Sequence, residues 1–272
     1  MTTFAGDNQC SYTVWMMVTV PRIAVAPSLD AAPFIYGIRC AADLRSGLTL
    51  SSPAETVRSF REGAADLALV PSSCVPSLPD AELATEYCIG SSGASGSALL
   101  AGGVPPAEAR RIFFDPEAPA EARLAAYLCE RHWRTKPEFI ACPDPASADT
   151  GCAGDLSLLA GERALCAAGR CAVVCDLGAE WSRTTRQPFV FAVWVARKGA
   201  DKARTEALQR ALTFGLEHAY ETVLDGGWAD KPYDAYGHLT RQTDYIFDLQ
   251  KHKALQKFWD SGIKVSPRAN PG

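Results

Sequence analysis

Residues 188–196 read PFVFAVWVA, and this stretch decides the fold. Nearly every side chain in it is apolar, and the aromatic and β-branched types are typical of a strand buried on both faces. A long helix is expected directly after it, over residues 201–224, because apolar side chains recur there at four-residue steps. The steps are Leu208, Leu212, Leu216 and Tyr220. The stretch therefore predicts the centre of a sheet that is covered by a helix.

Strands and helices alternate before this stretch. Short strands are expected at residues 18–26, 48–50, 66–70, 112–114, 139–142 and 171–175. Among the helix signals the clearest is Ser52-Pro53-Ala54-Glu55, in which Ser52 is the N-cap, Pro53 takes the first helical position and Glu55 can reach back to the N-cap amide. Such alternation is typical of an α/β fold with largely parallel sheets.

Two apolar strands predict two lobes. The chain builds one α/β region, leaves it through residues 98–101, builds a second region and returns through residues 189–196. Two crossings form a hinge with a ligand cleft beneath it. The predicted division is a tail with the start of the first strand at 1–19, a first lobe at 20–98 plus 195–272, and a second lobe at 99–194.

The composition narrows the class of partner. The 272 residues are 47% apolar and 21% charged, with a formal net charge of -4, which leaves room for two lobes of about 100–150 residues each. A nucleic-acid surface would need clustered Lys and Arg, and no basic stripe is present. A small molecule or a protein is the expected partner.

Ten cysteines stand out, but no C-x-x-C pair occurs, so neither a zinc ribbon nor a dithiol motif is predicted. The apolar run at residues 13–20 has no Lys or Arg before it and is far shorter than the roughly 20 residues that span a bilayer. We therefore predict a cytoplasmic chain with reduced thiols and no membrane association; an exported chain with disulfides is the alternative. The histidines lack i, i+4 partners, so neither a metal site nor a histidine dyad is predicted: His132, His218, His238 and His252.

Small polar residues at the ends of the expected strands are candidates for ligand contact. Ser72 follows the strand at 66–70 and serves either as a helix cap or as a ligand contact. A run of serine and glycine precedes the first crossing, where it forms either a tight turn or part of a binding site. Its candidate residues are Ser91, Ser92, Ser95 and Gly96.

Several stretches together indicate a family. They are RIAV (22–25), LDAAP (29–33), LVPS (69–72), CIGS (88–91), GS (96–97), LAGERAL (159–165), DLGAEW (176–181) and PFVFAVW (188–194). The order of elements resembles the type II periplasmic-binding-protein fold, in which a ligand sits between two α/β lobes. The stretches, in order and spacing, resemble the chorismate dehydratase family of the futalosine route to menaquinone, over about residues 20–260.

The resemblance implies a lyase without metal or cofactor that removes water from chorismate to give 3-[(1-carboxyvinyl)oxy]benzoate. Two positions match family residues at the reacting ring. Ser97 falls on the serine of the family's Gly-Ser-Val stretch, and Asp30 falls where the family usually has asparagine. An aspartate can act as a general base, whereas its charge also repels a dianionic substrate, and both effects stay open at this stage.

Three other places depart from the family pattern. Ala118-Pro119-Ala120-Glu121 stands where the family carries Ser-Arg-Thr-Ser, a run that holds a substrate carboxylate at a helix N-terminus. Ala120 and Glu121 are thus the aligned substrate-binding positions. Gly161 and Glu162 stand where the family has Gly-Asp, at the hinge or in the cleft. Arg186 stands where the family usually has glycine and is a candidate replacement for the lost cation.

These departures leave a second function open, namely a diverged binding protein of the same fold that recognises a small carboxylate without reaction. The related pathway enzyme that makes dihydroxynaphthoate on this fold ranks last, because its N-terminal Ser-Pro-Cys-Pro-Asn-Asp sequence is absent. The expected ligand is chorismate or another small carboxylate. The oligomeric state is not predicted.

Overall fold

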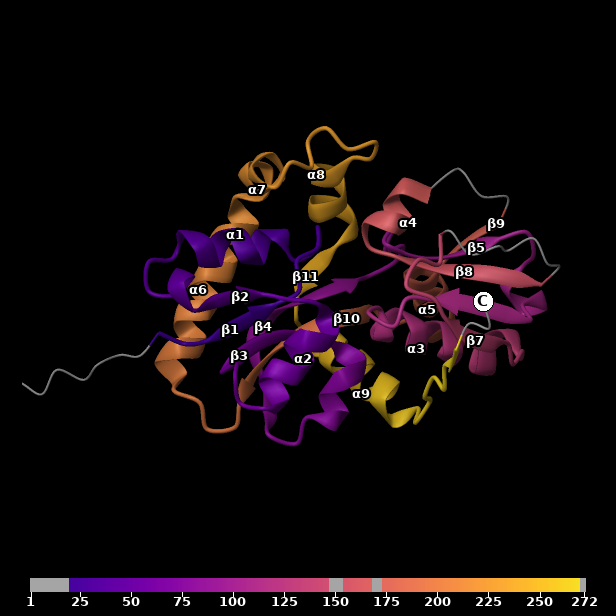
Figure 1. The fold of residues 1–272 in the computed structure, drawn as a ribbon, viewed down its shortest axis with the longest axis horizontal. Coiled ribbons are helices and arrows are strands. Elements are labelled where there is room, and N and C mark those ends of the chain that lie inside the picture. Colours follow the sequence, from indigo (N-terminus) through magenta and orange to yellow (C-terminus); the bar gives the residue numbers. More distant parts are fainter. Residues whose placement is uncertain (1–19, 147–153, 168–172, 270–272) are drawn as a thin grey trace, which may run out of the picture.

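The computed structural model describes residues 20–146, 154–167 and 173–269. Their strands form two six-stranded sheets, which lie side by side in Figure 1. We call the sheet that contains β1, with the helices packed on it, the first lobe, and the sheet that contains β6, with its helices, the second lobe. The two-lobe α/β fold expected from the sequence is confirmed.

The first sheet has the strand order β11-β4-β10-β3-β1-β2. Its strands are β1 (Ile23–Val25), β2 (Leu48–Leu50), β3 (Leu67–Pro71), β4 (Ala81–Ser91), β10 (Phe189–Arg197) and β11 (Asp244–Ile246). β1 pairs in parallel with β2 and β3, whereas the pairings of β10 with β3 and β4, and of β11 with β4, are antiparallel. The sheet is therefore mixed, not largely parallel.

The second sheet has the order β12-β7-β6-β8-β5-β9. Its strands are β5 (Ala98–Gly102), β6 (Arg111–Phe114), β7 (Glu138–Ala141), β8 (Asp155–Ala160), β9 (Val173–Asp176) and β12 (Arg268–Ala269). β6, β7, β8 and β12 pair in parallel, and β5 runs antiparallel to both of its neighbours. Both sheets thus combine a parallel part with antiparallel strands at one side.

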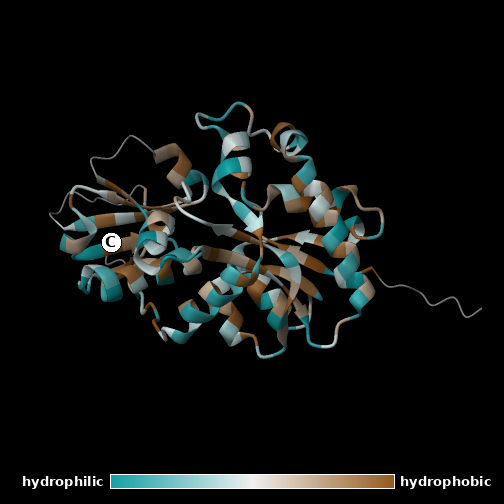
Figure 2. Ribbon diagram, turned by 180° about the vertical axis from the view of Figure 1, so that it is seen from behind, coloured by the Kyte–Doolittle hydropathy of each residue, from teal (hydrophilic) through white to brown (hydrophobic). Residues whose placement is uncertain are grey.

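Helices cover both sheets. They are α1 (Ala32–Cys40), α2 (Pro53–Arg61), α3 (Pro119–Leu128), α4 (Glu162–Ala167), α5 (Leu177–Thr185), α6 (Lys202–Glu217), α7 (Ala219–Asp225), α8 (Ala235–Gly237) and α9 (Leu249–Asp260). Figure 2 shows brown, hydrophobic segments along the strands and teal on the outer helices. None of the helices in the described ranges is long and apolar enough to cross a membrane.

The first helices begin where the sequence predicts. Ser52 caps α2 by accepting from the Glu55 amide, and the Glu55 side chain accepts from the Ser52 amide, which completes the expected capping box. α1 crosses α6 at two glycines, where a Cβ on Gly37 would meet the Ala211 carbonyl oxygen at 1.9 Å. This backbone-to-backbone contact fixes α1, and with it the residues that precede its first turn.

Two expected elements differ in the structure. The helix expected over 201–224 is broken into α6 and α7 at His218, whose φ of -112° and ψ of 38° leave the helical region and whose Nδ1 contacts the Phe214 carbonyl oxygen at 2.8 Å. Segments expected to be helical up to residue 258 also contain a strand, β11. The tail at residues 1–19 and the apolar run at 13–19 lie outside the described residues.

The chain passes between the lobes after β4 and before β10, as expected, and a third time after α9. The third passage carries β12 into the second sheet, and Figure 1 shows it as the yellow segment that leaves α9. All of β10 lies in the first sheet. The lobe boundaries at residues 98/99 and 194/195 remain a prediction.

Candidate functional site

A cavity of about 320 Å³ lies between the lobes. The parallel strands β1, β3, β6 and β8 end at it, and α1, α2, α3 and α4 begin beside it. Such strand ends are where open α/β sheets bind ligands, and helix N-termini there favour negative charge. Five residues predicted from the sequence line this cavity: Asp30, Ser97, Ala120, Glu121 and Gly161.

Asp30 lies just before α1 and pairs with a histidine from a distant part of the chain. Its Oδ1 is 2.7 Å from Nε2 of His238 and accepts a hydrogen bond of 3.0 Å from the Thr243 hydroxyl. The His238 side chain is 1% exposed and that of Asp30 is 14% exposed, so this is a nearly buried ion pair. Neither His238 nor Thr243 was a sequence-based candidate.

The segment that holds Asp30 is itself held in place. Tyr245 of β11 donates its hydroxyl to the Asp30 carbonyl oxygen at 2.9 Å. Burial and the nearby charge of Asp30 raise the pKa of Tyr245 well above its ordinary value, so the phenol stays protonated. The backbone of Asp30 and one of its carboxylate oxygens are thus both fixed from residues 238–245.

Ser97 enters the cavity at the start of β5. The amides of Ser95 and Gly96 donate to the Asp176 carboxylate at 3.0 and 2.7 Å, and the Gly161 amide donates to the Ser97 carbonyl oxygen at 2.8 Å. No hydrogen bond joins the Ser97 hydroxyl to another group in the described ranges. The backbone is therefore anchored on both sides, while the hydroxyl is available to a ligand.

Glu121 occupies the first turn of α3 on the opposite wall. Burial raises its pKa to about 7, its own backbone amide opposes that shift, and the negative charges of Asp30 and Asp115 add to it. A carboxyl with this pKa is partly protonated near neutral pH and can both donate and accept a proton. The position that the sequence aligned with substrate binding therefore holds a carboxyl group that titrates near neutral pH.

The cavity wall is acidic. Asp30, Asp115, Glu117 and Glu121 line it, and Arg163 is the basic residue among the described lining. Arg163 pairs with Asp115 at 2.6 Å, so its charge is partly compensated. Positive potential for an anion comes also from the first-turn amides of α3, which have no partner inside the helix.

Two carboxylates of the second lobe reach across to the first lobe on either side of the cavity. Glu117 accepts from the Ala54 amide at 2.8 Å and from the Ser52 hydroxyl at 3.3 Å, at the N-terminus of α2. Glu162 accepts from Trp228 Nε1 at 3.0 Å and from the Tyr233 hydroxyl at 2.9 Å. These contacts hold the lobes together over the cavity.

Electrostatics around Glu162 favour its charged form. Burial raises the pKa of its carboxyl, but the hydrogen bonds from Trp228 and Tyr233 and the charge of Lys231 lower it by more, so the pKa lies below its ordinary value. Glu162 is predicted at the hinge or in the cleft; it does not line this cavity and forms an interlobe contact beside it.

The structure does not bring the other predicted residues into this cavity. The Ser72 hydroxyl donates to the Val190 carbonyl oxygen at 2.6 Å, and Ser91 is buried with no hydrogen-bond partner for its hydroxyl in the described part of the chain. Ser95 and Gly96 do not line the cavity. Their amides donate to the Asp176 carboxylate and so hold the backbone that precedes Ser97. Arg186 is exposed at the end of α5 with a φ of 59° and does not line the cavity. Among the described residues, the arginine that lines the cavity is Arg163.

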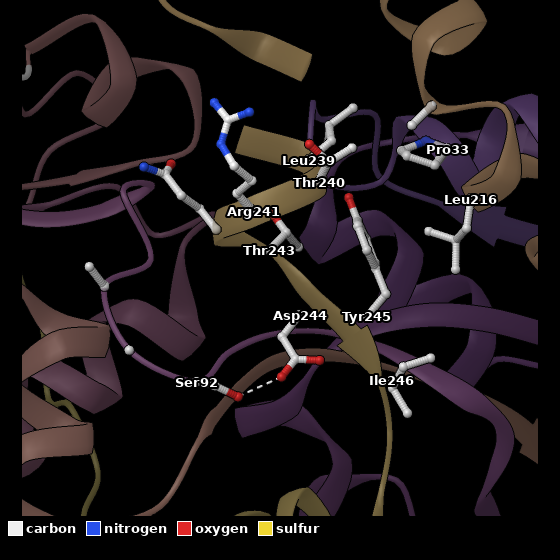
Figure 3. A pocket seen from close by; sticks show the side chains of 14 residues that line it. Pro33, Ser92, Leu216, Leu239, Thr240, Arg241, Thr243, Asp244, Tyr245 and Ile246 are labelled. Atoms are coloured by element: carbon white, nitrogen blue, oxygen red, sulfur yellow. Dashed lines mark hydrogen bonds between the residues drawn. The ribbon is translucent and has the colours of Figure 1, made fainter. Parts of the chain in front are cut away.

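A second, open cavity of about 740 Å³ lies behind the segment that holds Asp30. Figure 3 shows Thr240, Arg241, Thr243 and Tyr245 along one side of it and Ser92 hydrogen-bonded to Asp244. That bond is 2.5 Å long, and Asp244 also pairs at 2.7 Å with Lys251, whose side chain is 2% exposed. Ser92 therefore lines this second cavity and not the one between the lobes.

No group of three or more His, Cys, Asp or Glu side chains in the described ranges is placed to hold a metal ion. Seven cysteines fall in those ranges, and all of them are free thiols: Cys40, Cys74, Cys88, Cys129, Cys142, Cys166 and Cys175. None of the seven lines the cavity between the lobes.

Comparisons with known proteins agree with this architecture. Residues 21–226 match the family described as "Menaquinone biosynthesis". Protein AF1704 from Archaeoglobus fulgidus is similar with a TM-score of 0.70 at 15% identity, over 88% of this chain and 95% of that one. The alkanesulfonate-binding protein SsuA from Xanthomonas axonopodis pv. citri, bound to MOPS, gives a TM-score of 0.61 at 10% identity, over 89% and 93%.

The description of a third similar structure names the fold. The Candida albicans CA3427 gene product, described as having the generic periplasmic binding protein fold, gives a TM-score of 0.51 at 10% identity, over 94% of this chain and 99% of that one. At these identities the likeness concerns the fold, which is that of the periplasmic binding proteins.

Proposed function

The chain belongs to the menaquinone biosynthesis family, and from that premise we propose that it is a chorismate dehydratase-like lyase. It would convert chorismate to 3-[(1-carboxyvinyl)oxy]benzoate and water in the cavity between the lobes. The observation that carries the proposal is the meeting of Asp30, Ser97 and Glu121 around this one cavity. Together they supply a carboxylate, a free hydroxyl and a carboxyl that can be protonated.

The reaction needs proton transfer in a site that excludes water. Chorismate carries a ring proton and a hydroxyl on adjacent carbons. When Asp30 takes the ring proton, the C–H electron pair forms a ring double bond, the C–O bond breaks, and the ring becomes aromatic. Protonated Glu121 gives its proton to the departing hydroxide, which leaves as water, and the proton on Asp30 returns to Glu121 through solvent before the next turnover.

Ser97 is assigned the role of orienting the substrate. Its backbone is fixed through Asp176 and Gly161, and its hydroxyl has no hydrogen bond in the described part of the chain. A fixed hydroxyl can hold the leaving oxygen in line with the base without any reorganisation during the reaction. The two interlobe contacts at Glu117 and Glu162 hold the walls of the cavity together around the substrate.

Binding a dianion in an acidic cavity requires local compensation. The first-turn amides of α3 and the guanidinium of Arg163 supply positive potential on the second-lobe wall. Protonation of Glu121, whose pKa is about 7, removes a negative charge from the same wall. We therefore expect substrate to bind together with a proton.

The direct test is turnover. Purified protein mixed with chorismate and a metal chelator should give the enolpyruvyl benzoate, followed by chromatography and by the absorbance change on aromatisation. Arg186→Ala, at an exposed position outside the cavity, is the matched control and should turn over at the rate of the parent chain. Absence of product at high enzyme concentration would contradict the proposal.

A binding protein for a small carboxylate is the second candidate function. It is favoured by the acidic side chains of Asp30 and Glu121, which stand at positions where the family pattern has no acidic residue. A ligand raises the melting temperature whether or not it reacts. A thermal-shift series of chorismate, aromatic acids and dicarboxylic acids separates the two. If another acid shifts the melting temperature and chorismate does not, the binding function replaces the lyase.

Location follows the proposed pathway. We propose the cytoplasm, where the free thiols described above would stay reduced. Recovery of the native protein in the membrane or periplasmic fraction of its host cells would contradict this.

A further inference from the structure

We propose that His238 is a positioning residue for Asp30, and that the two side chains form a carboxylate–imidazolium pair which presents one carboxylate oxygen to the cavity as the base. The inference rests on the proposed lyase function for its kinetic consequence. The state of the pair itself can be measured without turnover.

Hydrogen-bond partners at both ring nitrogens indicate the charge of His238. Nε2 faces Oδ1 of Asp30 at 2.7 Å, and Nδ1 faces Oε1 of Gln242 at 2.8 Å. Both facing atoms are acceptors, so the ring meets both contacts only when each nitrogen carries a proton. An imidazole with two protons is a cation.

The surroundings make this pair strong. With only 1% of the His238 side chain exposed, bulk water does little to screen it from Asp30. Burial lowers the pKa of His238, but the hydrogen bond and negative charge of Asp30, with the contact to Gln242, raise it by more, and the net pKa lies above its ordinary value. The positive charge is therefore fully present below the ordinary pKa of histidine and is lost as pH rises through the raised pKa.

Neighbouring titratable groups do not supply that charge. Glu121 of α3, Tyr233 before α8 and Tyr245 of β11 all interact electrostatically with Asp30. The pKa of each tyrosine is raised, so both phenols are neutral, and Glu121 is neutral or negative. Across the cavity, Arg163 is paired with Asp115.

The hydrogen bonds leave the two oxygens of Asp30 unequal. Oδ1 accepts from both His238 and Thr243, whereas Oδ2 has no hydrogen-bond partner in the described part of the chain. Since Asp30 lines the cavity, Oδ2 is the oxygen that can take a proton from a ligand. The imidazolium keeps its own protons through this step and offsets the carboxylate's repulsion of an anionic substrate.

This arrangement explains how an aspartate works at a place where the family pattern has asparagine. An asparagine amide needs no counter-charge, whereas an aspartate beside an anionic substrate does. His238 lies 208 residues away in sequence and supplies it. Asp30 and His238 therefore act as one unit, and replacing either removes the function of both.

Two experiments test the pair. In the ligand-free protein, ¹⁵N-edited NMR of the imidazole groups should show both nitrogens of His238 protonated at pH 7, and Asp30→Asn should lower its titration midpoint. For turnover, His238→Gln keeps a donor for Oδ1 but no charge. We expect it to lower kcat about 100-fold, with a smaller change in KM, and to shift the acidic limb of the pH profile to higher pH.

Controls separate positioning from folding. His252→Gln changes an exposed histidine that stacks on Phe247 away from the cavity, and it should leave kcat and KM unchanged. In the Asp30→Asn background, His238→Gln should lower kcat no further, because the unit is already broken. A neutral His238 ring at pH 7, or full activity of a folded His238→Gln variant, overturns the inference. If the parent chain does not act on chorismate, the NMR titration still decides whether the pair exists.

Discussion

The two walls of the cavity handle a carboxyl group in different ways. On the first-lobe wall Asp30 is paired with His238 and hydrogen-bonded to Thr243. On the second-lobe wall no cation of the described residues forms an ion pair with Glu121, and burial raises its pKa to about 7. One wall gives its carboxylate a hydrogen-bonded imidazole partner, and the other holds a carboxyl whose pKa is raised by burial. Two acidic residues in one small cavity thus lie in different environments, which is the basis for assigning one as base and the other as acid in the proposed mechanism.

The largest effect on turnover is expected from replacing Asp30, the carboxylate of the first-lobe wall. Asp30→Asn restores the amide typical of the family pattern but leaves no proton acceptor beside His238. We expect turnover of chorismate to fall about 10³-fold, measured as kcat at pH 7.5 with the melting temperature as the folding control. Retained activity would show that an amide suffices and that the wall acts only by orientation.

Glu121→Gln tests the raised pKa on the second-lobe wall through its effect on the free energy of unfolding. The pKa of Glu121 is about 7 in the folded chain against an ordinary value of 4.5. Between these values the folded chain binds more protons, so the free energy of unfolding falls as pH rises from about 4.5 to 7. The variant avoids this loss and should exceed the parent in stability at pH 8 by up to about 3 kcal/mol, with the difference gone near pH 4.

Urea unfolding at pH 4, 6 and 8 measures this difference. Glu206→Gln, at an exposed position on α6, is the matched control and should show no such pH dependence. The same Glu121→Gln variant should bind a dicarboxylate with an affinity that no longer improves as pH falls from 8 to 6. An unchanged pH dependence would mean that Glu121 is ionised throughout and that the two walls do not differ.

Ser97→Ala removes the hydroxyl that lies between the two carboxyl groups in the proposed mechanism. Because its backbone is anchored through Asp176 and Gly161, the fold should be unaffected. We expect kcat to fall about 100-fold, at the low end for loss of a positioned hydrogen-bond donor. Steady-state kinetics provide the measurement, and an unchanged rate would remove Ser97 from the site.

Glu162→Gln gives the smallest expected effect. It weakens the hydrogen bonds to Trp228 and Tyr233 by removing the charge of the acceptor. Since Glu162 is partly exposed, we expect a loss of about 1 kcal/mol or less in the free energy of unfolding at pH 7. The loss should shrink as pH falls and the parent carboxylate takes up a proton. A loss that is equal at pH 7 and pH 4 would contradict a role for the charge.

Local features of the fold were predictable from the sequence, and the contacts that define the site were not. The capping box at Ser52 and the strand β10 depend on neighbouring residues, and both are present. β4 was missed because its first seven residues, AELATEY, contain no apolar run and are at most half-buried. The helix break at His218 depends on packing against α1 that no local pattern reveals.

The candidate site shows the same division. Asp30, Ser97 and Glu121 were found because short stretches around them match a family pattern, and all three line the cavity. His238 was passed over because its partner is 208 residues away and no i, i+4 pattern surrounds it. The one available signal was the aspartate at an asparagine position, since a buried carboxylate requires a partner somewhere in the chain.

The third passage between the lobes has a practical consequence for the edge of the second sheet. β12 pairs with β7 through residues 268 and 269, and Arg268 forms an ion pair with Glu138 on that strand. A chain cut after Asp260 would keep every helix but uncover the outer backbone groups of β7. Exposed strand edges recruit other chains, so these last residues protect the protein from edge-to-edge aggregation.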